Sequence, residues 1–106
     1  MKAFLIDPEK KKVSIVDIDF FVHDYRKISK MIEAKYFTTV RINSDHDTVY
    51  VDDEGLYTDK ASFMLKSYPT PLKGKGLVLG VNDEGDSIEP VLSYETLKSM
   101  IFWEMG

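Results

Sequence analysis

The chain has 106 residues, which is enough for one domain and too few for two ordinary ones. Hydrophobic residues make up 43% of it and charged residues 30%, a balance that disfavours disorder. It contains no cysteine, which excludes disulfide bonds and thiolate metal sites. Its net charge of −4 disfavours broad binding to nucleic acid, which needs clustered lysine and arginine.

Targeting signals are not evident in the sequence. The apolar run at residues 3–6 is short and ends in charge, whereas a signal peptide needs a longer apolar region and a cleavage site. No segment has the length of a membrane span. We therefore expect a single cytoplasmic domain over residues 1–106, without contact with a membrane.

The first elements form a predicted β-hairpin. Residues 2–7 are a short apolar run, and residues 13–18 alternate between apolar and polar side chains, as strands do. Pro8, in the connection between them, is preset for the first central position of a turn.

The period then changes, and residues 20–35 are a predicted helix that Asp19 can cap. One apolar stripe runs along it at spacings of four, three and four. The stripe consists of Phe21, Tyr25, Ile28 and Ile32.

Strands are predicted next at residues 36–42, 48–51 and 77–81. Gly80, inside the last of these, predicts the close approach of another element. Residues 59–68 fit either a strand or the start of a helix. We favour a short strand at residues 62–66, because the prolines that follow push their predecessors towards extended geometry.

A second helix is predicted over residues 93–104, with Ser93 as its N-cap. The side chains of Met100, Phe102 and Trp103 widen its apolar surface beyond one stripe. Either this excess contacts a partner, most simply a second copy of the chain, or the last turn wraps an edge of the sheet. We therefore expect an α+β fold, with a mostly antiparallel sheet of five or six short strands built from hairpins and two helices packed on it.

Residues 68–93 include the run Tyr-Pro-Thr-Pro-Leu-Lys-Gly-Lys-Gly-Leu-Val-Leu-Gly. This run, with the order of elements around it, resembles a family of small phage- and plasmid-encoded proteins catalogued as a domain of unknown function. Residues 56–66 depart from the usual pattern of that family. The resemblance implies a mobile-element origin, and hence the cytoplasm of a host cell, but no activity and no catalytic residues.

The candidate ligand site is Lys73-Gly74-Lys75-Gly76. Glycines let backbone N–H groups approach a ligand closely, and two lysines add positive charge, so such a turn can bind phosphate or carboxylate. It lacks the spacing of a P-loop and precedes a strand rather than a helix. The alternative is a tight entry to a central strand, where glycine serves backbone geometry.

Other polar clusters lack the spacing that chemistry needs. Asp45, His46 and Asp47 are adjacent, so their side chains diverge, and we interpret them as a solvated loop rather than a metal site. His23 and Asp24 would need a partner in a cleft to act as acid and base. We expect no catalytic site, no metal and no cofactor.

The favoured hypothesis is a non-enzymatic modulator that binds a protein of the host, or a second copy of itself, through Met100, Phe102 and Trp103. The alternative is a nucleotide- or phosphate-binding protein that uses residues 73–76. Nucleic acid is disfavoured by the acidic total, although Lys10-Lys11-Lys12 and the basic side of the first helix are local exceptions.

Overall fold

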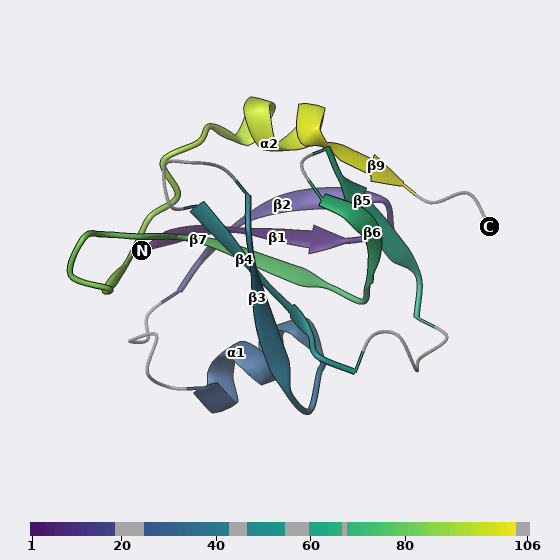
Figure 1. Cartoon of the computed structure of the whole chain (residues 1–106), viewed down its shortest axis with the longest axis horizontal. Coiled ribbons are helices and arrows are strands. Elements are labelled where there is room, and N and C mark those ends of the chain that lie inside the picture. The colour runs from purple at the N-terminus through teal and green to yellow at the C-terminus, as the bar shows by residue number, and fades with distance from the viewer. Residues whose placement is uncertain (19–24, 43–46, 55–59, 67, 104–106) are drawn as a thin grey trace.

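The computed structural model describes residues 1–18, 25–42, 47–54, 60–66 and 68–103 (Figure 1). Within these ranges, nine strands form two antiparallel sheets and two helices cover them. The large sheet has the order β2 (Lys12–Asp17), β1 (Lys2–Asp7), β7 (Gly76–Val81), β4 (Asp47–Asp52) and β3 (Phe37–Arg41), and β8 (Ser87–Ile88) also pairs with β7. The small sheet has the order β6 (Tyr68–Lys73), β5 (Ser62–Leu65) and β9 (Ile101–Trp103). The helices are α1 (Tyr25–Ile32) and α2 (Tyr94–Met100).

This architecture confirms the predicted α+β class and the mostly antiparallel pairing. It has more strands than the five or six expected, in two sheets rather than one. The N-terminal hairpin forms as predicted, with β1 and β2 paired from Lys2 opposite Asp17 to Asp7 opposite Lys12. Residues 62–65 are a strand, which decides the ambiguity over residues 59–68 for the part of that segment that the structure describes.

The C-terminal helix is shorter than predicted. Ser93 caps it as expected, since its side chain accepts a hydrogen bond from the Thr96 backbone N–H at 3.1 Å. The helix ends at Met100, and Ile101 has extended backbone angles. Residues 101–103 then pair with β5 as β9, because two aromatic residues and a β-branched one suit a strand that has a partner.

The first helix is described from Tyr25 onward, so Asp19, Phe21 and the residues up to 24 lie outside the described part. It ends after Ile32, where Glu33 takes a left-handed conformation with φ of 56°. The Ala34 N–H donates to the Ser29 carbonyl at 3.0 Å and closes the last turn. Neither helix of the described residues is long and apolar enough to cross a membrane.

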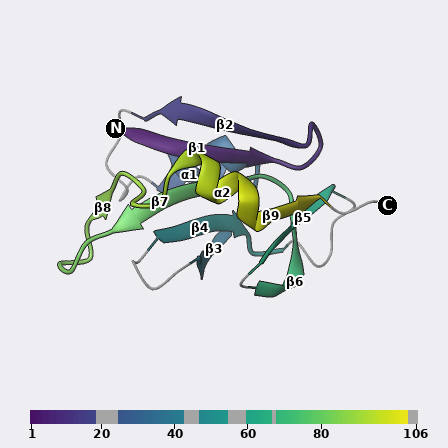
Figure 2. The same ribbon diagram turned by 90° about the horizontal axis from the view of Figure 1, so that it is seen from above.

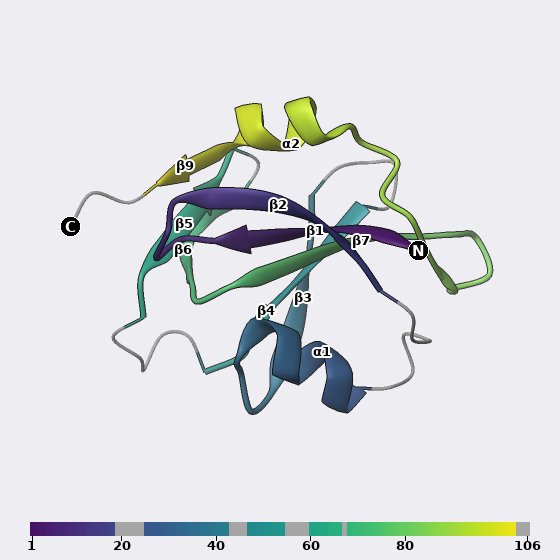
Figure 3. The same ribbon diagram turned by 180° about the vertical axis from the view of Figure 1, so that it is seen from behind.

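The large sheet separates two cores. Figures 1 and 3 show α1 on one face of this sheet, and Figure 2 shows α2 lying across the other face. Side chains alternate along each strand, so Ala3 of β1 and Leu77 of β7 belong to the core under α1, whereas Phe4 and Val78 belong to the opposite core. The larger core also takes in residues of the small sheet, α2 and β9, and its fully buried members include Phe63, Leu65 and Leu97.

Two glycines of β7 allow other elements to come close. A Cβ atom on Gly76 would lie 2.8 Å from Val49 Cγ2 and 3.0 Å from Phe63 Cζ, so Gly76 is where the small sheet packs onto the large one. A Cβ atom on Gly80 would lie 2.8 Å from the Glu89 carbonyl oxygen. The predicted close approach at Gly80 is therefore confirmed, and the approaching segment is the one that follows β8.

Asp47 is the main correction to the sequence-based placement. It was predicted to lie in a solvated loop, but it opens β4 and is fully buried. Its two carboxylate oxygens accept hydrogen bonds from the backbone N–H groups of Val91 at 2.8 Å and Leu92 at 2.9 Å. A buried carboxylate needs such donors, and here they fix the segment that leads into α2.

Replacing Gly76 with Ala should destabilise the fold by about 1–3 kcal/mol, because the new methyl group overpacks the junction of the sheets. Chemical denaturation measures the loss. Combining the change with Val49→Ala, which removes the nearer neighbour, should cost about 1 kcal/mol less than the sum of the two single changes. Strict additivity would contradict the proposed contact.

Replacing Asp47 with Ala should lower the free energy of unfolding by about 3 kcal/mol, because the backbone N–H groups of Val91 and Leu92 lose the acceptor that holds them. Asp47→Asn keeps one amide oxygen as an acceptor and should cost less. Hydrogen exchange should accelerate first at Val91 and Leu92. Unchanged exchange at these two amides would show that the carboxylate does not hold the segment.

Candidate functional site

The predicted ligand turn, residues 73–76, connects β6 of the small sheet to β7 of the large sheet. Gly74 has a φ of 87°, a left-handed conformation that favours glycine. Its backbone N–H donates to the Ala61 carbonyl at 2.8 Å. Gly76 is required by the packing of its neighbours. Both glycines therefore allow the chain to pass from one sheet to the other, which is the alternative to a ligand-binding role for this turn.

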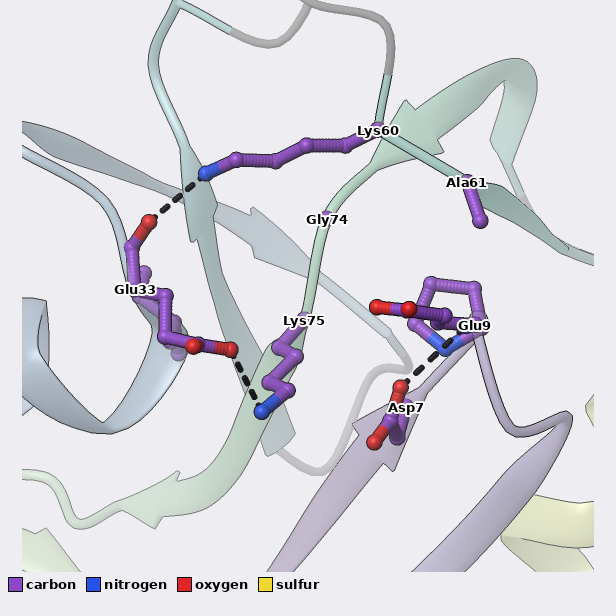
Figure 4. Close-up of a pocket in the computed structure, with 9 residues that line it drawn as sticks. Asp7, Glu9, Glu33, Lys60, Ala61, Gly74 and Lys75 are labelled. Carbon is purple, nitrogen blue, oxygen red and sulfur yellow. Dashed lines mark hydrogen bonds and ion pairs between the residues drawn. The ribbon is translucent and has the colours of Figure 1, made fainter.

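A cavity of about 200 Å³ nevertheless lies beside this turn (Figure 4). The β1–β2 turn, the end of α1 and the segment before β5 form its other walls. Its lining residues are Asp7, Pro8, Glu9, Ile32, Glu33, Lys60, Ala61, Gly74 and Lys75. We call it the turn cavity.

The lysines of the turn cavity are engaged by acidic side chains and a carbonyl group. Lys75 Nζ lies 2.5 Å from Glu33 Oε2. Lys60 Nζ lies 3.1 Å from Asp52 Oδ2 and donates to the Glu33 carbonyl at 2.6 Å. Figure 4 shows Lys60 and Lys75 reaching Glu33 from two sides. Glu33 therefore ties the end of α1 to both walls of the cavity.

These contacts shift the ionisation of both partners. The hydrogen bond from Lys75, together with its charge, lowers the pKa of Glu33 below its ordinary value. The same hydrogen bond to Glu33 raises the pKa of Lys75, against the opposing effect of burial. Both groups are therefore charged at neutral pH, and an anionic ligand would have to displace Glu33 from Lys75. Ligand binding by Lys73, Gly74, Lys75 and Gly76 stays a prediction.

The pairing of Glu33 with Lys75 has a pH signature. Because the pKa of Glu33 is lower in the folded state, its contribution to stability is present above the unfolded pKa and lost as pH falls through the folded one. Carboxyl carbon NMR should give Glu33 a pKa below its ordinary value, and Lys75→Met should move it back upwards. The matched variant Lys30→Met should leave it in place. An unchanged Glu33 titration in Lys75→Met would contradict the ion pair.

The predicted interaction surface divides between the two faces of β9. Ile101 is buried, and Met100 and Trp103 are partly buried against the larger core. Phe102 is 54% exposed. Successive side chains of a strand point to opposite faces, so burial of Ile101 and Trp103 forces Phe102 outward. Wrapping of the C-terminal segment on the sheet therefore accounts for most of the apolar excess, but not for Phe102.

A second cavity, of about 180 Å³, lies between the β1–β2 hairpin and the C-terminal elements. Its lining residues are Lys11, Lys12, Val13, Tyr94, Lys98 and Trp103. We call it the lysine pocket. The Tyr94 hydroxyl donates to the Val13 carbonyl at 2.8 Å and holds α2 against β2. Sequence reasoning missed this pocket, although the lysine run at 10–12 and Trp103 had each been singled out.

The remaining candidates do not assemble into a site within the described residues. No group of three His, Cys, Asp or Glu side chains there could hold a metal ion. The Asp47 carboxylate accepts hydrogen bonds from the backbone N–H groups of Val91 and Leu92. His23, Asp24, Asp45 and His46 lie outside the described residues.

Comparison with known protein families identifies a matching family model. The family model described as domain of unknown function (DUF3846) matches residues 1–99. This agrees with the resemblance seen in residues 68–93. No curated protein and no solved structure gives a match.

Proposed function

This chain belongs to the DUF3846 family of domains of unknown function, and from that premise we propose that it is a non-catalytic domain that binds another protein through the outer face of β9. The observation that carries the proposal is the exposure of Phe102. A large aromatic side chain that is more than half exposed on a strand is a typical anchor for a partner.

The surroundings of Phe102 support this proposal. β9 is the outermost strand in the order β6-β5-β9. Phe102 stands opposite Met64 of β5, which is itself only partly buried, so the two form an apolar patch on one face of the small sheet. The other edge, β6, carries Pro69 and Pro71, which cannot donate backbone hydrogen bonds to an added strand. The β9 side is therefore the edge better suited to a partner.

A protein of a host cell is the partner we propose first, on the basis of the phage or plasmid origin that the sequence resemblance implies. In that setting the domain modulates the host protein by contact, in the cytoplasm, without catalysis or a cofactor. A second copy of the chain is the other partner to be tested, since a patch on an edge strand can pair with itself.

A nucleotide or phosphate ligand at residues 73–76 has less support. The Gly74 N–H and the Lys75 ammonium group, which such a ligand would use, already bind Ala61 and Glu33. The turn cavity still has room for a small anion, so thermal shift against a nucleotide panel is the measurement for this alternative. A ligand that binds only the folded state would raise the melting temperature.

Replacing Phe102 with Ser should weaken the complex with the partner by about 30-fold, the loss typical of a central aromatic anchor. Ile15→Ser on β2 is the matched control, because Ile15 is 56% exposed on a strand of the other sheet. Affinity capture from host cells, with size-exclusion light scattering to detect self-association, measures binding. Both variants should keep their unfolding free energy within about 0.5 kcal/mol. Equal loss of binding in both, or in neither, would refute the choice of surface.

A further inference from the structure

The lysine pocket brings together three lysines and two aromatic residues from distant parts of the chain. Lys11 and Lys12 come from the β1–β2 hairpin, whereas Lys98 and Tyr94 come from α2 and Trp103 from β9. Lys98 Nζ lies 5.1 Å from the centre of the Tyr94 ring, a cation–π distance that holds the ammonium group at the pocket wall.

The charge of this pocket is not neutralised by the described residues. None of its three lysines forms an ion pair with another described residue. None of the six residues that line the pocket is acidic. The turn cavity is the opposite case, since both of its lysines face carboxylates. Three like charges around a hollow attract an anionic group, most strongly where aromatic walls exclude water.

The backbone of Lys11 gives an independent indication. Lys11 has a φ of 51°, the left-handed region, and its N–H donates to the Pro8 carbonyl at 3.3 Å to close the hairpin turn. Glycine or asparagine would adopt this conformation at lower cost. The turn thus carries a residue that is unfavourable for its backbone and that lines the pocket with a lysine.

The size of the pocket restricts what it can bind. Small-molecule sites usually enclose about 300 Å³ or more. The lysine pocket, at about 180 Å³, is closer to the size of one side chain. It also adjoins β9, the strand whose outer face carries Phe102. A peptide chain at β9 could therefore place one side chain beside Trp103 while another part of the partner covers Phe102.

We propose that the lysine pocket binds a carboxylate side chain from an acidic segment of the partner protein. This inference rests on the proposed protein-binding function and adds the chemistry of the partner. Lys11, Lys12 and Lys98 supply the charge, and Trp103 and Tyr94 contact the methylene groups of the bound side chain. The whole chain is acidic, so the pocket is a local positive site that selects a short acidic segment rather than a long polyanion.

Trp103 makes this proposal directly measurable, because it is the only tryptophan of the chain. A hexapeptide of glutamate, titrated at low salt, should change the tryptophan fluorescence with saturation, whereas a hexapeptide of glutamine should not. Lys98→Gln and Lys11→Gly should each weaken the glutamate peptide by about fivefold, and raised salt should weaken it further. Lys11→Gly should also melt at the same or a higher temperature, since it relieves the backbone.

Lys30→Gln on α1 is the matched control, because it removes one exposed lysine on the opposite face of the large sheet. It should leave peptide affinity unchanged. The proposal is overturned if the glutamate peptide gives no saturable signal at millimolar concentration, or if Lys30→Gln weakens it as much as Lys98→Gln. It is also overturned if inorganic phosphate or a thymidine hexanucleotide binds more tightly, since the pocket would then be a phosphate or nucleic-acid site.

The same variants separate this inference from the proposed function. If Lys98→Gln and Lys11→Gly capture the partner as well as the wild type does, while Phe102→Ser does not, the surface stands and the acidic-segment inference fails. If Lys98→Gln and Lys11→Gly weaken capture of the partner while Phe102→Ser does not, the acidic-segment inference stands and the β9 surface fails.

Discussion

The placement of every candidate surface at the C-terminal end depends on the buried carboxylate of Asp47. It lies at the start of β4 and holds the backbone N–H groups of Val91 and Leu92. Those two residues precede the Ser93 cap, so the carboxylate fixes where α2 begins. α2 in turn places Tyr94 and Lys98 against the β1–β2 hairpin. Because β9 follows α2 directly, α2 also positions β9 for its pairing with β5. A single buried aspartate in the large sheet therefore positions both Phe102 and the lysine pocket.

Close packing between the two sheets adds a second constraint. β6 and β7 are consecutive in the chain, but they belong to different sheets, and the turn between them needs Gly74 for its backbone and Gly76 for its contacts. The Gly-Lys-Gly run is thus explained by the fold without a ligand. The contacts between the sheets do not explain Lys11, whose left-handed backbone is costly for a residue with a side chain.

Local patterns in the sequence were enough to predict the first hairpin. Alternation in residues 13–18 and the turn preference of Pro8 are both short-range signals, and they are sufficient to predict two paired strands with a turn between them. The end of α2 was not predictable in this way. Ile101 continues the helical spacing of Tyr94 and Leu97, so the pattern alone extends the helix. Only pairing with β5, itself ambiguous in sequence, makes residues 101–103 a strand.

The functional features that sequence reasoning missed are all non-local. Asp47 sits among polar residues typical of a loop, and its partners lie 44 and 45 residues away. The lysine pocket needs the hairpin and the C-terminal elements to meet, which no spacing along the chain records. The turn cavity and the lysine pocket likewise differ in whether acidic side chains lie close to their lysines, not in whether they contain lysines. Both contain lysines, but only the turn cavity supplies carboxylates to neutralise them.

The outer face of β9 is the surface through which we propose that this domain contacts another protein. Site-specific photo-crosslinking tests it most directly, with a benzophenone amino acid placed at position 102 and, in a separate variant, at position 15. Ile15 is as exposed as Phe102 but lies on the other sheet. The account predicts one discrete crosslinked protein from position 102 and none from position 15. The same products from both positions, or a discrete product from position 15 alone, would contradict it.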